Sequence, residues 1–258
     1  MKIIYPDKVT AITATEANAA YPASNLQDEH PNKVWRALTR DAKVTVQVGA
    51  GSNAVAVFAT NATSVSMLVS ESGRSIEWDT DIEWDTDIEW YTNTELVPTY
   101  EVYDSSSTNE GAFWAEYTTY DIPHQLELTF EAAVGEIVEA GVISAGTSNS
   151  FSDPKYGMQE GLIDYSVIKK LANDAFYIKD QDVVRTFACT LMLDRDTDFY
   201  VFMLDIAKML GANPFAIRVS TNKTNWEWVV YVRFNGLPRG THDCIDNSGV
   251  AFNLLEVL

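Results

Sequence analysis

Residues 43–59 read KVTVQVGAGSNAVAVFA, and this stretch decides the fold class. In residues 43–48, valine alternates with polar residues, which is typical of a strand with one buried face. Residues 54–59 are a second short apolar run of strand length. The polar and glycine-rich residues 49–53 between them predict a turn. The stretch therefore predicts two successive strands.

More strands of the same kind follow in the first half of the chain. We expect them at residues 65–69, 113–120, 125–130 and 134–143. Short strands separated by frequent turn signals are typical of a β-sandwich or jelly roll.

The second half combines strands with one helix. Strands are expected at 183–193, 215–220, 226–234 and 249–258, the middle two forming a hairpin around residues 221–225. A helix is expected from DRDTD (194–198), with Thr197 or Asp196 as its N-cap. Its apolar stripe is Phe199, Phe202, Met203, Ile206 and Leu210, and Gly211 and Pro214 end it. The pattern predicts an α+β unit, an antiparallel sheet with one packed helix.

The hairpin has large apolar residues on both faces. Trp226, Trp228, Val230 and Phe234 share one face, and Val229 and Tyr231 share the other. Burial on both faces in so small a unit predicts a partner chain or a covering domain.

Charge and turn residues predict two domains. Residues 1–140 hold 7 Lys and Arg against 23 Asp and Glu, a formal charge of −16. The remaining residues hold 11 against 14, a charge of −3. Residues 147–161, TSNSFSDPKYGMQEG, are turn-rich and are the expected connection. We therefore expect a jelly-roll domain at 1–146 and an α+β assembly domain at 147–258.

A hexapeptide, IEWDTD, occurs at 76–81 and 82–87, and IEWYTN follows. Six is a multiple of the strand period of two, so the copies keep their alternation. Residues 76–92 are expected to form a β arm with its isoleucines and tryptophans on one buried face and its acids on the other. The acidic face has two interpretations. It is either a solvated or partner-facing edge, or a calcium site at Asp79, Asp81, Asp85 and Asp87 without the glycine turn of a calcium loop.

The composition argues against several functions. The net charge of −19 disfavours nucleic acid and anionic membranes as partners. No apolar run is long enough to span a bilayer, and no signal peptide is expected from the first ten residues, MKIIYPDKVT.

The sequence predicts no catalytic residue and no cofactor. His30, His124 and His242 lie in no nucleophile or metal motif. The run His242-Asp243-Cys244 cannot act as a triad on extended backbone, because adjacent residues do not face one another. Cys189 alternates with apolar residues and is expected to be buried.

Residues 21–37, YPASNLQDEHPNKVWRA, resemble the opening of discoidin or galactose-binding-like jelly rolls, in which an A-x-N-L-x-D turn leads to a buried tryptophan. Residues 58–67 fit the paired core strands of that fold. Trp35 is expected to be a core anchor, with a sugar platform as the alternative, and Arg36 is expected to pair with an acid. The resemblance carries over no sugar-site residue.

A wider resemblance runs from Ile3 to Leu258. The segments YGMQEGLIDYS (156–166), VRTF (184–187) and DRDTDF (194–199) resemble tail proteins encoded among the tail-tip genes of tailed bacteriophages. This implies a virion structural protein of the tail tip or baseplate. It would be made in the host cytoplasm and bound to other tail proteins and to copies of itself in a ring or hub. The alternative functions are a lectin-like module that recognises a host glycan and a glycan-active enzyme.

Overall fold

The computed structural model describes residues 1–71, 100–104, 111–154, 158–170, 176–179, 181–220, 229–242 and 247–257. The chain is mainly β, with antiparallel sheets and one helical segment at 195–210, which confirms the predicted fold class. The predicted IEWDTD arm at 76–92, together with Trp226, Trp228 and Cys244, lies outside the described residues.

One layer of the N-terminal sandwich is a five-stranded sheet in the order β2-β4-β9-β6-β7. Valine alternation makes β4 as predicted, since Val44, Val46 and Val48 are buried while Lys43 is exposed. The strands of this layer are β2 (Val9–Ala14), β4 (Asp41–Val48), β6 (Ala62–Glu71), β7 (Tyr100–Asp104) and β9 (His124–Ala132).

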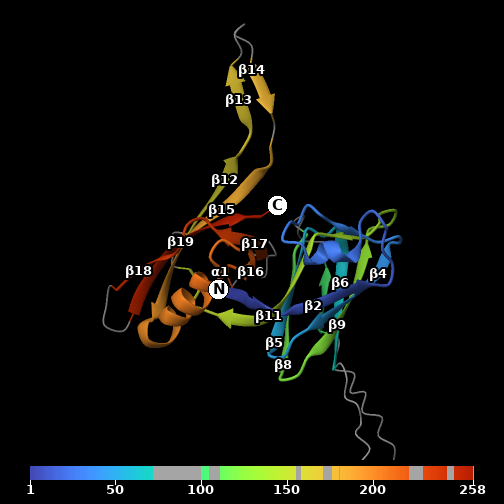
Figure 1. Ribbon diagram of the computed structural model, residues 1–258, viewed down its shortest axis with the longest axis horizontal. Coiled ribbons are helices and arrows are strands. Elements are labelled where there is room, and N and C mark those ends of the chain that lie inside the picture. Colours follow the sequence, from blue (N-terminus) through green and yellow to red (C-terminus); the bar gives the residue numbers. More distant parts are fainter. Residues whose placement is uncertain are drawn as a thin grey trace, which may run out of the picture.

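The facing layer belongs to a ten-stranded sheet in the order β12-β15-β19-β17-β16-β1-β11-β5-β8, with β18 beside β19. Figure 1 shows how this sheet continues from the sandwich into the C-terminal half. Its strands are β1 (Lys2–Asp7), β5 (Ser52–Phe58), β8 (Phe113–Tyr120), β11 (Val142–Ser150), β12 (Gln159–Asp164), β15 (Val183–Asp194), β16 (Phe215–Arg218), β17 (Val229–Phe234), β18 (Arg239–Thr241) and β19 (Asn247–Glu256).

Short elements complete the fold. The helical turn η1 (Ala23–Gln27) and the two-stranded pair β3 (Trp35–Arg36) and β10 (Glu139–Ala140) belong to the sandwich. A second pair, β13 (Val167–Lys170) and β14 (Phe176–Lys179), extends the hairpin that β12 and β15 begin.

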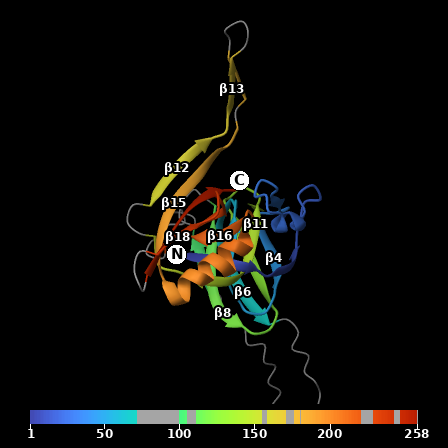
Figure 2. The ribbon, with the colours of Figure 1, turned by 60° about the vertical axis from the view of Figure 1, so that its left-hand side comes forward.

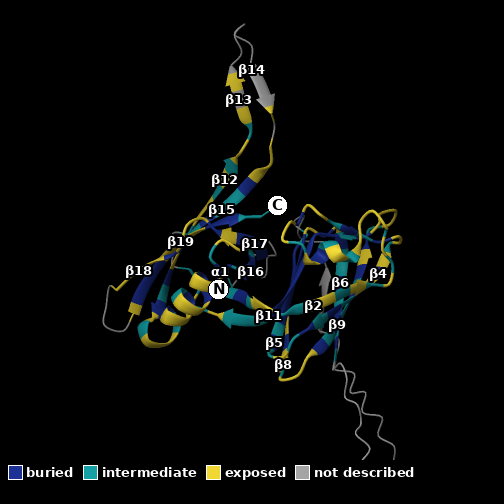
Figure 3. Ribbon diagram, viewed as in Figure 1, coloured by how far each residue is buried: buried dark blue, intermediate teal, exposed yellow. Residues whose placement is uncertain are grey.

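The sandwich core fills the space between its two layers. Val55, Val57 and Phe113 from the large sheet pack there with valines and leucines from β4, β6 and β9. The core is visible as the dark blue interior faces in Figure 3. Burial of this many aliphatic side chains is the main driving force for the sandwich.

The C-terminal core lies between the sheet and the helical segment, which runs through η3 (Arg195–Phe199), η4 (Val201–Ala207) and α1 (Lys208–Leu210). The apolar stripe packs as predicted: Phe199, Phe202, Ile206 and Leu210 are buried. Gly211, at a φ of 58°, ends the segment, again as predicted.

The predicted N-cap is wrong. Asp194, and neither Asp196 nor Thr197, caps the segment, because its carboxylate accepts hydrogen bonds from the backbone amides of both those residues at 2.9 and 3.1 Å. The N-cap therefore lies two to three residues before the predicted one, and β15, which ends at Asp194, runs directly into the helical segment.

A third apolar cluster explains the two-sided hairpin. Val230 and Phe234 share one face, as predicted, and pack in the helix-covered core, while Val229 and Tyr231 face the back of the sandwich. The Tyr231 and Phe58 rings lie 5.3 Å apart there. The cover expected for the second face is thus the N-terminal half of the same chain.

One expected strand and the expected inter-domain connection need correction. The segment expected as a strand at 134–143 is split, because the chain turns where the Glu136 amide donates to the Ala133 carbonyl at 3.0 Å. The turn-rich stretch 147–161 begins inside β11, where Ser150 pairs with Lys2. The expected domain boundary at 146/147 therefore falls within a strand, and the division into two domains stays a prediction.

Candidate functional site

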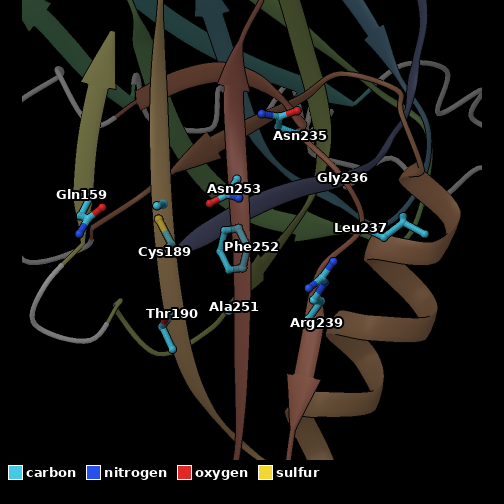
Figure 4. A pocket seen from close by; sticks show the side chains of 11 residues that line it. Gln159, Cys189, Thr190, Asn235, Gly236, Leu237, Arg239, Ala251, Phe252 and Asn253 are labelled. Carbon is cyan, nitrogen blue, oxygen red and sulfur yellow. The ribbon is translucent and has the colours of Figure 1, made fainter. Parts of the chain in front are cut away.

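A concave polar groove lies on the outer face of the C-terminal sheet (Figure 4). Gln159 is opposite Ala188, and Ala188 is opposite Asn253, so these three side chains share one face of β12, β15 and β19. The Asn235 amide donates to the Asn253 carbonyl at 2.9 Å, which extends the row beyond β19. The alternate residues, Cys189 among them, point to the helix-covered core.

A second row runs beside the first. Thr190 is opposite Ala251, and Ala251 is opposite Arg239 on β18. Leu237, with 66% of its surface exposed, stands at the rim. The groove encloses about 570 Å³, and an adjoining hollow of about 220 Å³ shares four of its lining residues, Gln159, Ala188, Asn235 and Asn253. The centre of the groove is lined by the small side chains of Ala188 and Ala251, which leave room above the sheet.

The polar side chains of the groove are free to bind a ligand. Within the described part of the chain, no hydrogen bond or ion pair involves the side chains of Gln159, Thr190, Asn235, Arg239 and Asn253. Arg239 is the one charged residue that lines the larger hollow. Glu160, in the smaller one, is paired with Arg185 at 2.9 Å. The groove therefore offers amide and hydroxyl groups with little net charge, inside a chain of charge −19.

The second feature is a hairpin that projects from the body of the molecule (Figures 1 and 2). β12 and β15 form its base and β13 and β14 its outer part. The two parts are joined where the Gln181 amide donates to the Ser166 hydroxyl at 3.0 Å. We call the described residues 159–170, 176–179 and 181–187 of this hairpin the projecting arm.

Large apolar side chains are exposed on the projecting arm. Leu162 is 71% exposed, and Tyr165, Val167 and Val183 are exposed as well. Figure 3 shows the described residues 159–167 of the arm as intermediate or exposed. A two-stranded hairpin is marginally stable in water on its own, so this surface is suited to contact with another molecule.

Trp35 and Arg36 have the structural roles that were expected of them. Trp35 is fully buried, with its ring 5.9 Å from that of Phe130, which confirms the core anchor and excludes a sugar platform. Among the described residues, its indole Nε1 has no hydrogen-bond partner. Arg36 pairs with Glu139 at 2.7 Å, as predicted, and its guanidinium lies 4.4 Å from the centre of the Tyr21 ring.

His124 is the one fully buried histidine among the described residues, and its two ring nitrogens contact uncharged groups. Its Nδ1–H donates to the Ile122 carbonyl at 3.2 Å, and its Nε2 accepts from the Tyr117 hydroxyl at 3.0 Å. Burial lowers the pKa of His124, and the Ile122 carbonyl opposes this only in part. Burial also raises the pKa of the Tyr117 hydroxyl. The pair is a neutral structural network within the sandwich.

The remaining candidate residues, His242, Cys189 and His30, do not come together in one site. His242 contacts the Ser248 hydroxyl at 2.8 Å, but Ser248 is buried and Asp243 and Cys244 lie outside the described residues. Burial raises the pKa of the Cys189 thiol to about 12, in keeping with its predicted role as a small apolar residue. His30 is exposed on the sandwich.

The described ranges hold no group of three or more histidine, cysteine or acidic residues that could bind a metal ion. The calcium candidates Asp79, Asp81, Asp85 and Asp87 lie outside those ranges, so the calcium hypothesis stays a prediction. Across the same ranges, no helix is long and apolar enough to cross a membrane.

Sequence reasoning identified neither the groove nor the projecting arm. The groove is lined by four separate segments, at 159, 188–190, 235–239 and 251–253, which only the sheet register brings together. A faint signal exists in the alternation of Thr186, Ala188 and Thr190 with buried residues, which marks one polar face of β15.

No family model matches this chain, and no curated protein matches it. Some solved structures are similar to part of this chain at low TM-scores. A chain in the crystal structure of reduced XRCC1 bound to the DNA polymerase β catalytic domain is 11% identical over 55% of this chain and 97% of that chain, with a TM-score of 0.37.

Two carbohydrate-binding modules are similar at the same level. CBM32-6 of GH89 from Clostridium perfringens is 17% identical over 53% of this chain and 92% of that chain, with a TM-score of 0.35. A chitosan-binding module from a Paenibacillus chitosanase/glucanase is 14% identical over 54% and 98%, with a TM-score of 0.36. At TM-scores below 0.5, these likenesses establish no ligand or partner for this chain.

Proposed function

We propose that this protein is a non-catalytic structural subunit of a larger protein assembly and that its projecting arm docks on a neighbouring chain. The observation that carries this proposal is the exposure of Leu162, Tyr165, Val167 and Val183 on a hairpin outside the body of the molecule. Apolar side chains gathered on a projecting element are stabilised when a partner removes them from water.

The resemblance to tail-tip proteins of tailed bacteriophages suggests which assembly this is. In that setting the neighbours are other tail proteins and further copies of the same chain, arranged as a ring or hub. The continuous sheet supports such a role, because its backbone pairing connects β12 and β15, the base of the arm, to the sandwich strands β11, β5 and β8.

Association of the full-length protein tests the proposal. We expect the wild-type chain to self-associate or to bind co-expressed tail proteins. The double variant Leu162→Ser/Tyr165→Ser should weaken the affinity of this association at least tenfold. Val134→Ser is the matched control, because Val134 is 86% exposed on the sandwich, away from the arm. Sedimentation velocity gives the first measurement. A monomeric wild-type protein whose arm also stays uncovered in cryo-electron microscopy of the virion contradicts the proposal.

Recognition of a glycan is the second candidate function. The resemblance of residues 21–37 points to the jelly-roll domain for this function, but the observation that favours it is the polar groove on the C-terminal sheet. Side-chain amides and hydroxyls without protein partners are the groups that recognise sugar hydroxyls. An array of glycans probed with the full-length protein tests this candidate.

A further inference from the structure

We propose that the groove on β12, β15, β18 and β19 binds an uncharged, extended oligosaccharide. The proposal rests on the second candidate function and names its site and ligand class. It places the site on the sheet of the C-terminal half, outside the sandwich loops.

The charge of the groove selects against ionic ligands. Arg239 is the one cation of the larger hollow, and the carboxylate of Glu160 in the smaller one is already paired with Arg185. An anionic chain would find a single arginine in a protein of net charge −19. A cationic ligand would find no unpaired carboxylate among the lining residues of either hollow.

The hydrogen-bonding groups fit a neutral polyol. Gln159, Asn235 and Asn253 each offer both a donor and an acceptor from one amide, which suits hydroxyl groups that also donate and accept. Ala188 and Ala251 leave the floor low and apolar, so the C–H face of a sugar ring can approach the sheet. Leu237 at the rim adds exposed apolar surface to the same contact.

The sheet itself argues against a peptide ligand. Peptides that bind β-proteins commonly pair with the backbone of an edge strand. Here the groove lies on the face of the sheet, where β15 and β19 are paired on both sides, so a ligand in the groove meets side chains and not the outer edges of β12 and β18. The adjoining hollows follow the row from Asn235 to Gln159, so a chain of several sugar units would lie across the strands.

Titration of the full-length protein with cellotetraose, maltotetraose, tetra-N-acetylchitotetraose and the anionic tetragalacturonate tests the proposal. We expect weak binding of at least one neutral tetrasaccharide, with a Kd on the order of 1 mM, and none of tetragalacturonate. Asn253→Ala should weaken that binding at least tenfold, and Ala251→Trp, which fills the floor, should abolish it. Gln27→Ala removes an exposed amide from the sandwich and should leave binding unchanged.

Circular dichroism and thermal unfolding show whether Ala251→Trp folds; if it does not, Asn253→Ala alone decides, because that side chain is exposed. Neutral glycan binding that survives these substitutions places the site elsewhere, which overturns this proposal but leaves glycan recognition standing. Preference for tetragalacturonate overturns the ligand class. If none of the four glycans binds and the array is also silent, both this proposal and the second candidate function fail.

Discussion

His124 makes the stability of the sandwich depend on pH. Its pKa in the folded protein is below the ordinary value of 6.5 because burial disfavours the imidazolium. As the pH falls below 6.5, the unfolded chain takes up a proton before the folded protein does, so the free energy of unfolding decreases. That stability is fully present above pH 6.5 and is lost as the pH falls toward the lower folded-state pKa.

Urea denaturation at pH 7.5, 6.5 and 5.5 measures this effect. His124→Gln should flatten the pH dependence, because it removes the group that titrates, whereas the exposed His30 replaced by Gln should leave it unchanged. Equal slopes for wild type and His124→Gln would show that the histidine does not couple to folding.

Gly146 is required by a close approach of two strands. A Cβ at this position would lie 2.0 Å from the carbonyl oxygen of Pro6, a backbone atom that cannot move without shifting β1. We expect Gly146→Ala to lower the free energy of unfolding by about 2 kcal/mol, as overpacking does. Gly49→Ala is the control, because its Cβ would meet its nearest neighbour at 3.6 Å. Thermal unfolding of both variants measures the difference.

At the scale of elements, two substitutions distinguish the observed N-cap, Asp194, from the predicted one, Asp196. Asp194→Ala should destabilise the protein by about 1 kcal/mol, since it removes the acceptor for two backbone amides at the start of η3. Asp196→Ala, at the position that the sequence pattern favours, should have a much smaller effect. Chemical denaturation compares the two, and a larger loss for Asp196→Ala contradicts the observed cap.

Strands could be predicted from the sequence where one face is buried and the other is exposed to solvent. β4, β9 and β15 alternate in this way, and their patterns located them to within two residues of the observed ends. β1 was missed because its KIIYPD sequence does not alternate and its partners, β11 and β16, are far away in the chain. Local patterns hold no information about such pairing, and the groove depends on the same long-range register.

At the scale of the whole molecule, β1 ties the two halves together. It pairs with β11 on one side and with β16 on the other, so the N-terminal residues join the sandwich layer to the C-terminal sheet. Met1 and Ile3 pack in the helix-covered core, while Ile4 packs in the cluster between the halves. The halves therefore share backbone pairing and apolar contacts as well as a covalent link.

This shared structure predicts the behaviour of fragments. A fragment of residues 147–258 loses β1 and with it Met1 and Ile3 from its core, and it exposes Tyr231, which Phe58 otherwise covers. We expect this fragment to show no cooperative transition in urea on its own, and to regain one when residues 1–146 are co-expressed with it. The physical reason is that the edge of β16 and one face of β17 then have no partner. A fragment 147–258 that unfolds cooperatively at the midpoint of the full-length protein would show instead that the C-terminal half folds independently, as the charge boundary in the sequence suggests.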